Sequence, residues 1–193
     1  RLRNASLLID PDGAIAARYD KMHMFDVSVG GVDYRESDAE RGGSRIVTAP
    51  VTAGGGAPWG VGMSVCYDLR FPELYRHLAQ AGADFIAVPS AFTQVTGEAH
   101  WHVLLRARAI ENGCFIFAPA QTGTHAGGRK TFGHALIVNP WGEVLADAGP
   151  TPGVILASVD PAEVARARGK VPAIGLEAGF SRLAPNPTPN RPP

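Results

Sequence analysis

The stretch Gly62-Met63-Ser64-Val65-Cys66-Tyr67-Asp68-Leu69-Arg70-Phe71-Pro72-Glu73-Leu74 decides how this chain folds and where its chemistry lies. An apolar run ends at Cys66, a polar break follows, and Pro72 begins a helical pattern, since proline is favoured in the first turn of a helix. A strand that leads directly into a helix start holds a thiol beside backbone N–H groups that no helical carbonyl uses. Such groups lower a thiol pKa and can bind an oxyanion, so the pattern predicts that Cys66 is a nucleophile rather than a structural cysteine.

Strand and helix patterns alternate on both sides of this stretch, which predicts an α/β fold. Helical signals cover Pro72 to Ala81 and Glu98 to Asn112, with a short helix after Pro161, and the polar stretch from Asp26 to Gly43 predicts a functional loop. In the second helix one face is lined by Val103, Leu104, Ala107 and Ile110. Strands are predicted at Asn4 to Ile9, Ala14 to Tyr19, Arg45 to Ala49, Trp59 to Val65, Asp84 to Pro89, Cys114 to Ala120, His134 to Asn139, Glu143 to Ala148 and Val154 to Val159.

Composition narrows the function classes. The 193 residues are 45% hydrophobic, and 18 basic side chains balance 18 acidic ones, which favours one globular domain. No basic stripe with interleaved aromatic residues points to a nucleic acid, and no apolar run approaches the roughly 20 residues of a membrane span. With only Cys66 and Cys114 present and no signal-peptide pattern, we expect reduced thiols and a cytoplasmic protein.

A cysteine nucleophile that attacks an acyl carbon needs a proton acceptor and a donor for the oxyanion, and the sequence leaves several partners open. Lys21 follows a predicted strand, at the rim where functional loops begin. The carboxylates that could serve as acid or base are Glu36, Asp68 and Glu73. The histidines that could form a cysteine–histidine pair are His23, His100, His102, His125 and His134.

The histidine spacing argues against a metal site. His100 and His102 lie two positions apart on a predicted helix, so their side chains point about 200° away from each other. The sequence offers no i, i+4 histidine pair and no histidine–carboxylate cluster in their place. We therefore expect neither a metal ion nor another cofactor.

Several motifs in one order resemble the nitrilase superfamily of carbon–nitrogen hydrolases, in its amidase branch. They are Tyr19-Asp20-Lys21-Met22-His23-Met24-Phe25-Asp26, Val65-Cys66-Tyr67-Asp68-Leu69-Arg70-Phe71-Pro72-Glu73-Leu74, Ala99-His100-Trp101, Arg106-Ala107-Arg108-Ala109-Ile110-Glu111-Asn112, Gly133-His134 and Asn139-Pro140-Trp141-Gly142. The resemblance implies a four-layer α-β-β-α sandwich that lacks its N-terminal part. Residues 1–184 would form this domain, and the Pro- and Asn-rich residues 185–193 would form a disordered tail.

The resemblance also implies roles for particular residues. Members of the family use a triad of glutamate, lysine and cysteine with a second glutamate beside it; Lys21 and Cys66 match the lysine and cysteine, and Glu36 matches the second glutamate. The ammonium of Lys21 and the backbone N–H of Tyr67 would hold the oxyanion. The first glutamate belongs to a segment ahead of Arg1, so we expect the chain alone to be nearly inactive.

The stretch from Ala91 to Trp101 is most similar to the deaminated glutathione amidases and ω-amidases, which implies substrate binding by Phe92, Thr93 and Thr96. The expected reaction is hydrolysis of a small carboxylate-bearing amide through a cysteine thioester, with release of ammonia or an amine. Hydrolysis of an N-carbamoyl amide is an alternative, and a non-catalytic scaffold or binding protein is an alternative of another class. The resemblance further implies a homodimer or higher oligomer that pairs through Pro72 to Ala81 and Glu98 to Asn112.

Overall fold

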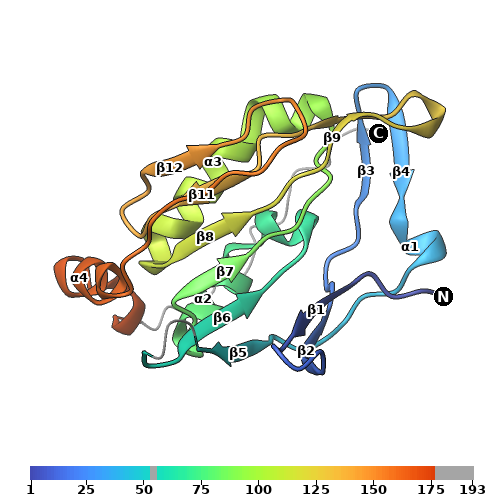
Figure 1. The fold of residues 1–193 in the computed structure, drawn as a ribbon. Helices are drawn as coiled ribbons and strands as arrows, with labels where there is room; N and C mark the ends of the chain where they lie inside the picture. Colours follow the sequence, from blue (N-terminus) through green and yellow to red (C-terminus); the bar gives the residue numbers. More distant parts are fainter. Residues whose placement is uncertain (53–55, 177–193) are drawn as a thin grey trace, which may run out of the picture.

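The computed structural model describes residues 1–52 and 56–176, and its centre is one six-stranded sheet (Figure 1). The strands lie in the order β12-β11-β8-β7-β6-β5, with the three central strands parallel and the others antiparallel to their neighbours. Their bounds are β5 Thr48–Val51, β6 Trp59–Met63, β7 Phe85–Ala87, β8 Phe115–Ala118, β11 Leu136–Val138 and β12 Val144–Asp147. Parallel neighbours require crossover connections, so the predicted α/β class is confirmed.

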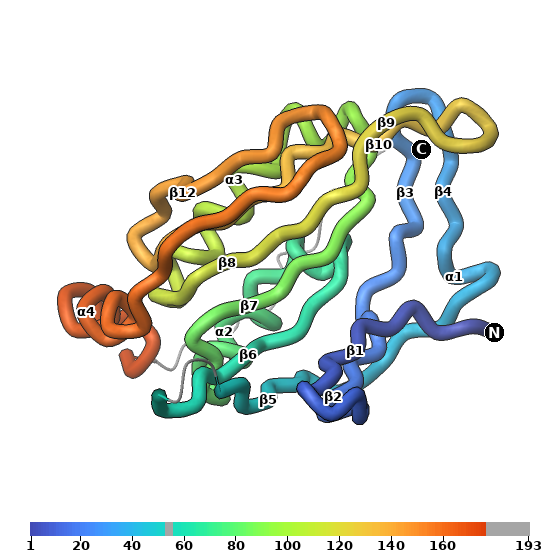
Figure 2. Tube along the Cα trace, in the orientation of Figure 1, coloured from blue at the N-terminus to red at the C-terminus, as the bar shows by residue number. Residues whose placement is uncertain are grey.

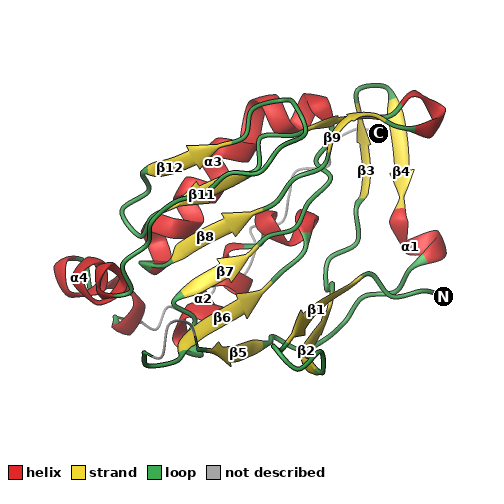
Figure 3. Cartoon of the chain, in the orientation of Figure 1, coloured by secondary structure: helices red, strands yellow, loops and turns green. Residues whose placement is uncertain are grey.

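Helices α2 (Pro72–Gln80) and α3 (Gln94–Asn112) make these crossovers and cover the same face of the sheet (Figure 3). Gly62 on β6 lets α2 approach, because a Cβ there would lie 3.3 Å from Cβ of Leu78 on α2. The core between the sheet and the helices includes the buried side chains of Leu74, Leu78, Ile86, Trp101, Leu105 and Ile116. Full burial of each large apolar side chain contributes about 1.5–3 kcal/mol.

The predicted apolar face of α3 is not the face that packs on the sheet. Val103 and Ile110 are 68% and 53% exposed, whereas Trp101, Leu105 and Ala109 are fully buried. The apolar pattern misleads because the buried face also carries two polar residues, Arg108 and Asn112, whose side chains donate hydrogen bonds to backbone carbonyls. Burial of these groups is tolerated because their donors are paired.

The other face of the sheet is aromatic. Trp59 and Phe85 pack edge to face with ring centroids 5.6 Å apart, and Phe85 and Phe117 do the same at 5.1 Å. The side chains of all three are half-buried. An α-β-β-α sandwich requires an apolar face of this kind, because its two sheets pack face to face.

Short hairpins extend the N-terminal part. Strands β1 (Ala5–Ile9) and β2 (Ile15–Asp20) form the predicted hairpin. The prediction of a loop from Asp26 to Gly43 is wrong: β3 (Asp26–Val29) and β4 (Val32–Arg35) pair side by side there, and α1 (Glu36–Ala39) follows (Figure 2). Gly30 and Gly31, with φ of 61° and 75°, supply the two-residue turn that such a hairpin needs.

The C-terminal part departs from the sequence pattern at one strand. The predicted strand from Val154 to Val159 is absent from the described residues, and Val154 and Leu156 are 89% and 88% exposed. The apolar alternation is present, but no neighbouring strand pairs with the segment there. Helix α4 (Ala162–Lys170) then confirms the predicted short helix, while the tail at residues 185–193 lies outside the described residues.

The remaining elements are small. Strands β9 (Thr122–Thr124) and β10 (Lys130–Phe132) pair antiparallel, and 3-10 turns occupy Cys66–Arg70, Ala126–Gly128 and Ala173–Gly175. Among the helices of residues 1–52 and 56–176, none has the length and apolar character to cross a membrane.

Candidate active site

Cys66 lies where the central strand β6 gives way to the 3-10 turn Cys66–Arg70 and then to α2. Its φ of 51° is in the left-handed region, and its backbone N–H donates to the carbonyl of Pro89 at 2.9 Å. A side-chain-bearing residue held there costs on the order of 1–3 kcal/mol, and such strain clusters at functional sites. The predicted strand–turn–helix arrangement around the cysteine is therefore present, at the carboxyl end of a central parallel strand, where α/β proteins bind ligands.

Asp68 fixes the shape of this turn. Its carboxylate is fully buried and accepts hydrogen bonds from the Val65 N–H at 2.9 Å, the Tyr19 hydroxyl at 2.8 Å and the His23 Nδ1 at 2.7 Å. The backbone N–H of His23 donates to the same carboxylate at 3.1 Å. With its oxygens occupied in this way, Asp68 holds the strand, the turn and β2 together and is not free to act as an acid or a base.

Lys21 and Glu36 form an ion pair beside the cysteine. Lys21 follows β2 with a side chain only 3% exposed, and its Nζ lies 2.6 Å from Oε1 of Glu36. The backbone N–H of Phe25 donates to Oε2 of the same carboxylate at 2.6 Å. Burial alone would raise the pKa of Glu36, but the hydrogen bonds from Lys21 and Phe25 outweigh it and hold that pKa below its usual value. The carboxylate therefore stays ionised and fixes the Lys21 ammonium in place.

One cavity of about 950 Å³ brings these residues together. Lys21, Glu36, Cys66 and Tyr67 all line it, although they come from separate elements of the chain. A volume of this size accommodates a small organic substrate. The arrangement places a thiol, a fixed ammonium and a backbone amide of the turn around one cavity.

The three residues predicted to bind substrate divide into two groups. Phe92 and Thr96 line the cavity, and Phe92 also packs on Trp101 with ring centroids 4.7 Å apart. Thr93 is outside the lining of the cavity; its hydroxyl accepts a hydrogen bond from the Thr96 N–H and caps α3. Threonine is favoured at this position because its oxygen satisfies an unpaired N–H of the first turn.

Three arginines that no sequence pattern marked also line the cavity: Arg35, Arg70 and Arg129. Arg70 ends the turn that Cys66 begins, and its guanidinium lies 5.6 Å from the ring centre of Phe92. Arg129 reaches the cavity from the segment before β10 and donates to the Ala91 carbonyl at 2.9 Å. The position of Arg70 within the nucleophile stretch could have been noted, but no local pattern marks Arg129.

Glu40 is a second carboxyl group in the cavity that the sequence did not reveal. Its Oε2 is buried without a hydrogen-bond partner among the described residues. Burial, followed by the nearby charge of Glu36, raises the pKa of Glu40. The environment therefore shifts the pKa values of Glu36 and Glu40 in opposite directions, lower for Glu36 and higher for Glu40.

The thiol pKa differs from the sequence-based expectation. Burial raises the pKa of Cys66, and the carboxylate of Glu36 adds to this effect, whereas the backbone of Ala91 and the cations Lys21 and Arg129 oppose it. The expectation of a lowered pKa is wrong because it counted the helix start and Lys21 but not the removal of the thiol from water. A group that accepts the thiol proton is consequently required for attack at neutral pH.

Alkylation of the protein by iodoacetamide should report this raised pKa. We expect labelling of Cys66 to rise by up to about tenfold per pH unit from pH 7 to 9, without the plateau of an activated thiolate. Burial raises the pKa of Cys114 to about 12, so this fully buried thiol should not react. Peptide mass spectrometry measures both sites, with Cys66→Ser as the control. A labelling rate already constant at pH 7 would contradict the raised pKa.

The five candidate histidines lie outside the described lining of the cavity. His23 bonds to Asp68, His125 Nε2 lies 2.7 Å from the Thr131 hydroxyl, and His100 Nδ1 lies 3.3 Å from an Arg70 nitrogen. A cysteine–histidine pair therefore has no support in this geometry.

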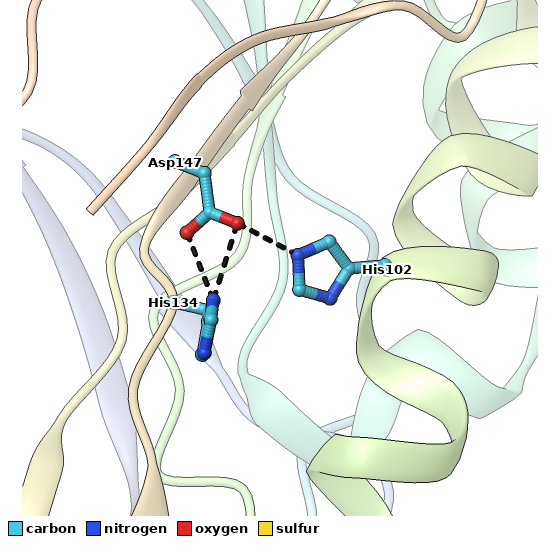
Figure 4. Close-up of side chains that lie close together, drawn as sticks. All are labelled: His102, His134 and Asp147. Carbon is cyan, nitrogen blue, oxygen red and sulfur yellow. Dashed lines mark hydrogen bonds and ion pairs between the residues drawn. The ribbon is translucent and has the colours of Figure 1, made fainter. Parts of the chain in front are cut away.

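The remaining two histidines correct another expectation. His102 and His134 meet Asp147, so the expectation that histidines and carboxylates form no cluster is wrong (Figure 4). The sequence-based expectation considered only histidines on the same helix. This cluster instead joins residues that are distant in the sequence.

A cysteine at the carboxyl end of β6, with a lysine–glutamate ion pair in the same cavity, indicates the class of protein. The family described as Carbon-nitrogen hydrolase matches residues 1–169. The chain belongs to this carbon–nitrogen hydrolase family, so the resemblance drawn from the motifs is confirmed.

Curated relatives include a deaminated glutathione amidase of Synechocystis sp., 48% identical over 89% of this chain and 62% of its own length. Another, of Yersinia enterocolitica, is 42% identical over 95% of this chain and 63% of its own length, so the chain spans less than two thirds of these relatives.

Solved structures agree on the fold. The NitFhit protein of C. elegans has a TM-score of 0.81 and 41% identity, covering 91% of this chain and 42% of its own. Nit3 of Saccharomyces cerevisiae, described as a member of the nitrilase superfamily, has a TM-score of 0.76 and 32% identity over 88% of this chain and 58% of its own. In a mutant amidase from Nesterenkonia sp. AN1, 27% identical with a TM-score of 0.68 over 89% of this chain and 63% of its own, acrylamide is added to the active-site cysteine.

Proposed function

We propose that this protein hydrolyses a small carboxylate-bearing amide through a thioester on Cys66. One observation carries the proposal: Cys66, the Lys21–Glu36 ion pair and three arginines line a single cavity. The names of the deaminated glutathione amidases support an amide of that type or an ω-amide of a 2-oxo acid. Hydrolysis of an N-carbamoyl amide is the alternative within the same family.

In the proposed mechanism, the Cys66 thiolate attacks the amide carbon and forms a C–S bond. The Lys21 ammonium and the Tyr67 backbone N–H hold the oxyanion, and preorganised donors of this kind are worth about 2.7–4 kcal/mol each. The C–N bond then breaks, and ammonia or an amine leaves with the proton taken from the thiol. Water adds to the thioester, the C–S bond breaks, and the carboxylic acid and the thiol are regenerated.

Proton transfer requires a general base near the thiol. Glu36 is held by Lys21 and Phe25, which supports a positioning role for it. The glutamate that completes the family triad has no match in this chain, so we propose that the 193 residues alone turn over little substrate. This point is tested by measuring the rate of amide hydrolysis for two purified proteins. One is the 193-residue chain, and the other is the product of the full reading frame that encodes it. Equal rates would contradict it.

Two of the three cavity arginines, Arg70 and Arg129, support a substrate that carries a carboxylate. Both Arg70 and Arg129 line the cavity with Cys66, and a guanidinium binds a carboxylate through two parallel hydrogen bonds. Neither arginine has an ion-pair partner among the described residues. The carboxylate of a bound substrate would supply a negative charge to pair with these arginines in the cavity.

Replacement of Arg129 by glutamine should raise KM for a carboxylate-bearing amide by at least about tenfold, because a hydrogen bond to a charged group contributes about 1.5–3 kcal/mol. The KM for a neutral amide of the same length should change by less than about twofold. Arg166→Gln, an exposed arginine on α4 outside the cavity, is the matched control. An equal loss for both substrates would contradict carboxylate recognition.

Release of ammonia from α-ketoglutaramate and of the amine from deaminated glutathione tests the function itself. N-carbamoyl amides in the same panel test the alternative substrate class. Turnover of an amide that depends on Cys66 would support the proposal. If the full reading frame released nothing from any amide, the proposal would fail and the scaffold interpretation would take its place.

Assembly and location are also proposals. We propose that α2 and α3 form a homodimer face, which the exposed apolar side chains Val103 and Ile110 on α3 support. Light scattering that gives a monomer mass at micromolar concentration would contradict the proposed dimer.

We also propose a cytoplasmic location, since both cysteines are free. Recovery of the protein in a secreted or membrane fraction would argue against it.

A further inference from the structure

We propose that His102, His134 and Asp147 form a binding site for one zinc-class divalent ion. The cluster joins the middle of α3, the segment between β10 and β11, and the end of β12 (Figure 4). One ligand atom from each residue lies within 4.8 Å of the others. None of the three lines the cavity that holds Cys66, so the site is separate from the proposed reaction centre.

The distances suit a metal after small side-chain rotations. His102 Nε2 lies 2.9 Å from Asp147 Oδ2, and His134 Nδ1 lies 3.0 Å from Oδ1 and 3.1 Å from Oδ2. Ligand bonds of about 2.0–2.2 Å in a tetrahedral site place neighbouring ligand atoms about 3.3–3.5 Å apart. Separations of 2.9 Å and at most 4.8 Å bracket that value.

The surroundings already orient the ligands. The Gly149 N–H donates to Asp147 Oδ1 at 2.8 Å, which leaves Oδ2 directed at the histidines. His134 is fixed at both backbone groups: its N–H donates to the Gly149 carbonyl at 2.8 Å, and its carbonyl accepts from Trp101 Nε1 at 2.7 Å. The Phe132 ring stacks on the His134 imidazole at 4.4 Å. These contacts restrict the positions of His134 and Asp147 before any ion binds.

The backbone of His134 adds an independent observation. Its φ of 55° lies in the left-handed region, which is unfavourable for a side-chain-bearing residue. The left-handed conformation is accompanied by the close approach of the imidazole to Asp147. Strained backbone conformations cluster at functional sites, so the conformation of His134 is consistent with a functional side chain.

The ligand types select the metal. Two imidazoles and one carboxylate suit Zn²⁺ and its neighbours, whereas Ca²⁺ and Mg²⁺ prefer oxygen ligands only. The Asp147 carboxylate lies within 3.1 Å of a ring nitrogen of each histidine, so it is placed to supply the oxygen ligand. Each neutral imidazole would bind the ion through the ring nitrogen that faces Asp147 and carry its proton on the other nitrogen, and water would fill a fourth position.

Titration of the tag-free protein with CoCl₂, followed by visible absorption, tests the site. The Cys66→Ser form is used so that the active-site thiol contributes no ligand. We expect one saturable Co²⁺ per chain with the absorption of a tetrahedral site, and displacement by ZnCl₂. His102→Gln and Asp147→Asn should each weaken binding by at least about tenfold, a loss that even outer partners of metal ligands produce.

His77→Gln, an exposed histidine on α2, is the matched control and should bind like the parent. Circular dichroism checks that each variant is folded; if Asp147→Asn is not, the half-exposed His102→Gln decides. Absence of saturable binding, or binding that His102→Gln leaves within twofold of the parent, would overturn the proposal. Because the readout is metal binding, its failure is distinguishable from failure of the proposed amidase activity.

Discussion

Replacement of Cys66 by serine should lower kcat/KM for the amide substrate by at least about a thousandfold, or about 4 kcal/mol of transition-state free energy. A serine hydroxyl in the same position has a far higher pKa than a thiol, and no histidine lines the described cavity to activate it. The substitution changes one atom, so the shape of the turn should persist. Steady-state assays of ammonia or amine release measure the loss.

Cys114→Ala is the matched control for this change. Cys114 is fully buried just ahead of β8, outside the lining of the cavity, and its loss should leave kcat/KM within about twofold. Both variants must show the circular dichroism spectrum of the parent. A Cys66→Ser protein that keeps more than a tenth of the parent activity would contradict the assignment of Cys66 as the nucleophile.

Replacement of Lys21 by methionine should have the second-largest effect, a decrease of kcat by about 100- to 1,000-fold. The substitution removes the ammonium proposed to hold the oxyanion and keeps most of the apolar volume of a side chain that is only 3% exposed. KM should change less than kcat, because the charge on the oxygen develops in the transition state. Assays of both constants with one amide substrate give the comparison.

The same substitution should also destabilise the protein in a pH-dependent way. The ion pair helps to hold the pKa of Glu36 below its ordinary value, so this carboxylate contributes stability above the unfolded pKa, near 4.3, that is lost as the pH falls. Lys21→Met removes that contribution, so the difference in free energy of unfolding between variant and parent should be larger at pH 7 than at pH 4. Urea denaturation at both pH values measures it.

Two further variants separate charge from structure at Lys21. Lys130→Met removes an exposed lysine of β10 outside the cavity and should change neither kcat nor stability appreciably. In the double variant Lys21→Met with Glu36→Gln, the buried carboxylate is gone, so stability should recover while kcat stays low. A Lys21→Met protein with kcat within threefold of the parent would contradict the proposed oxyanion role.

The sequence predicted most reliably what depends on neighbours along the chain. The strand, the turn and the helix around Cys66 follow from one apolar run, one polar break and Pro72, and all are present. Lys21 could be selected because it follows a strand. Its partner Glu36 was one of three candidate carboxylates, and only the family resemblance singled it out.

What the sequence could not predict arises from packing between distant segments. Arg129 and Glu40 enter the cavity from segments that carry no local signal, and the cluster around Asp147 joins three separate elements. The buried face of α3 was missed because buried polar residues such as Arg108 interrupt the apolar period. The raised pKa of Cys66 was missed for a similar reason, since desolvation depends on the assembled cavity.

Mass spectrometry of the protein encoded by the full reading frame tests the central proposal most directly. The protein is quenched in acid during turnover of α-ketoglutaramate and is measured both intact and after digestion to peptides. The account predicts one acyl adduct per chain on the peptide that contains Cys66, which hydroxylamine removes. The Cys66→Ser form should carry no such thioester. Continued release of ammonia with no adduct at Cys66, or an adduct on another residue, would contradict the account.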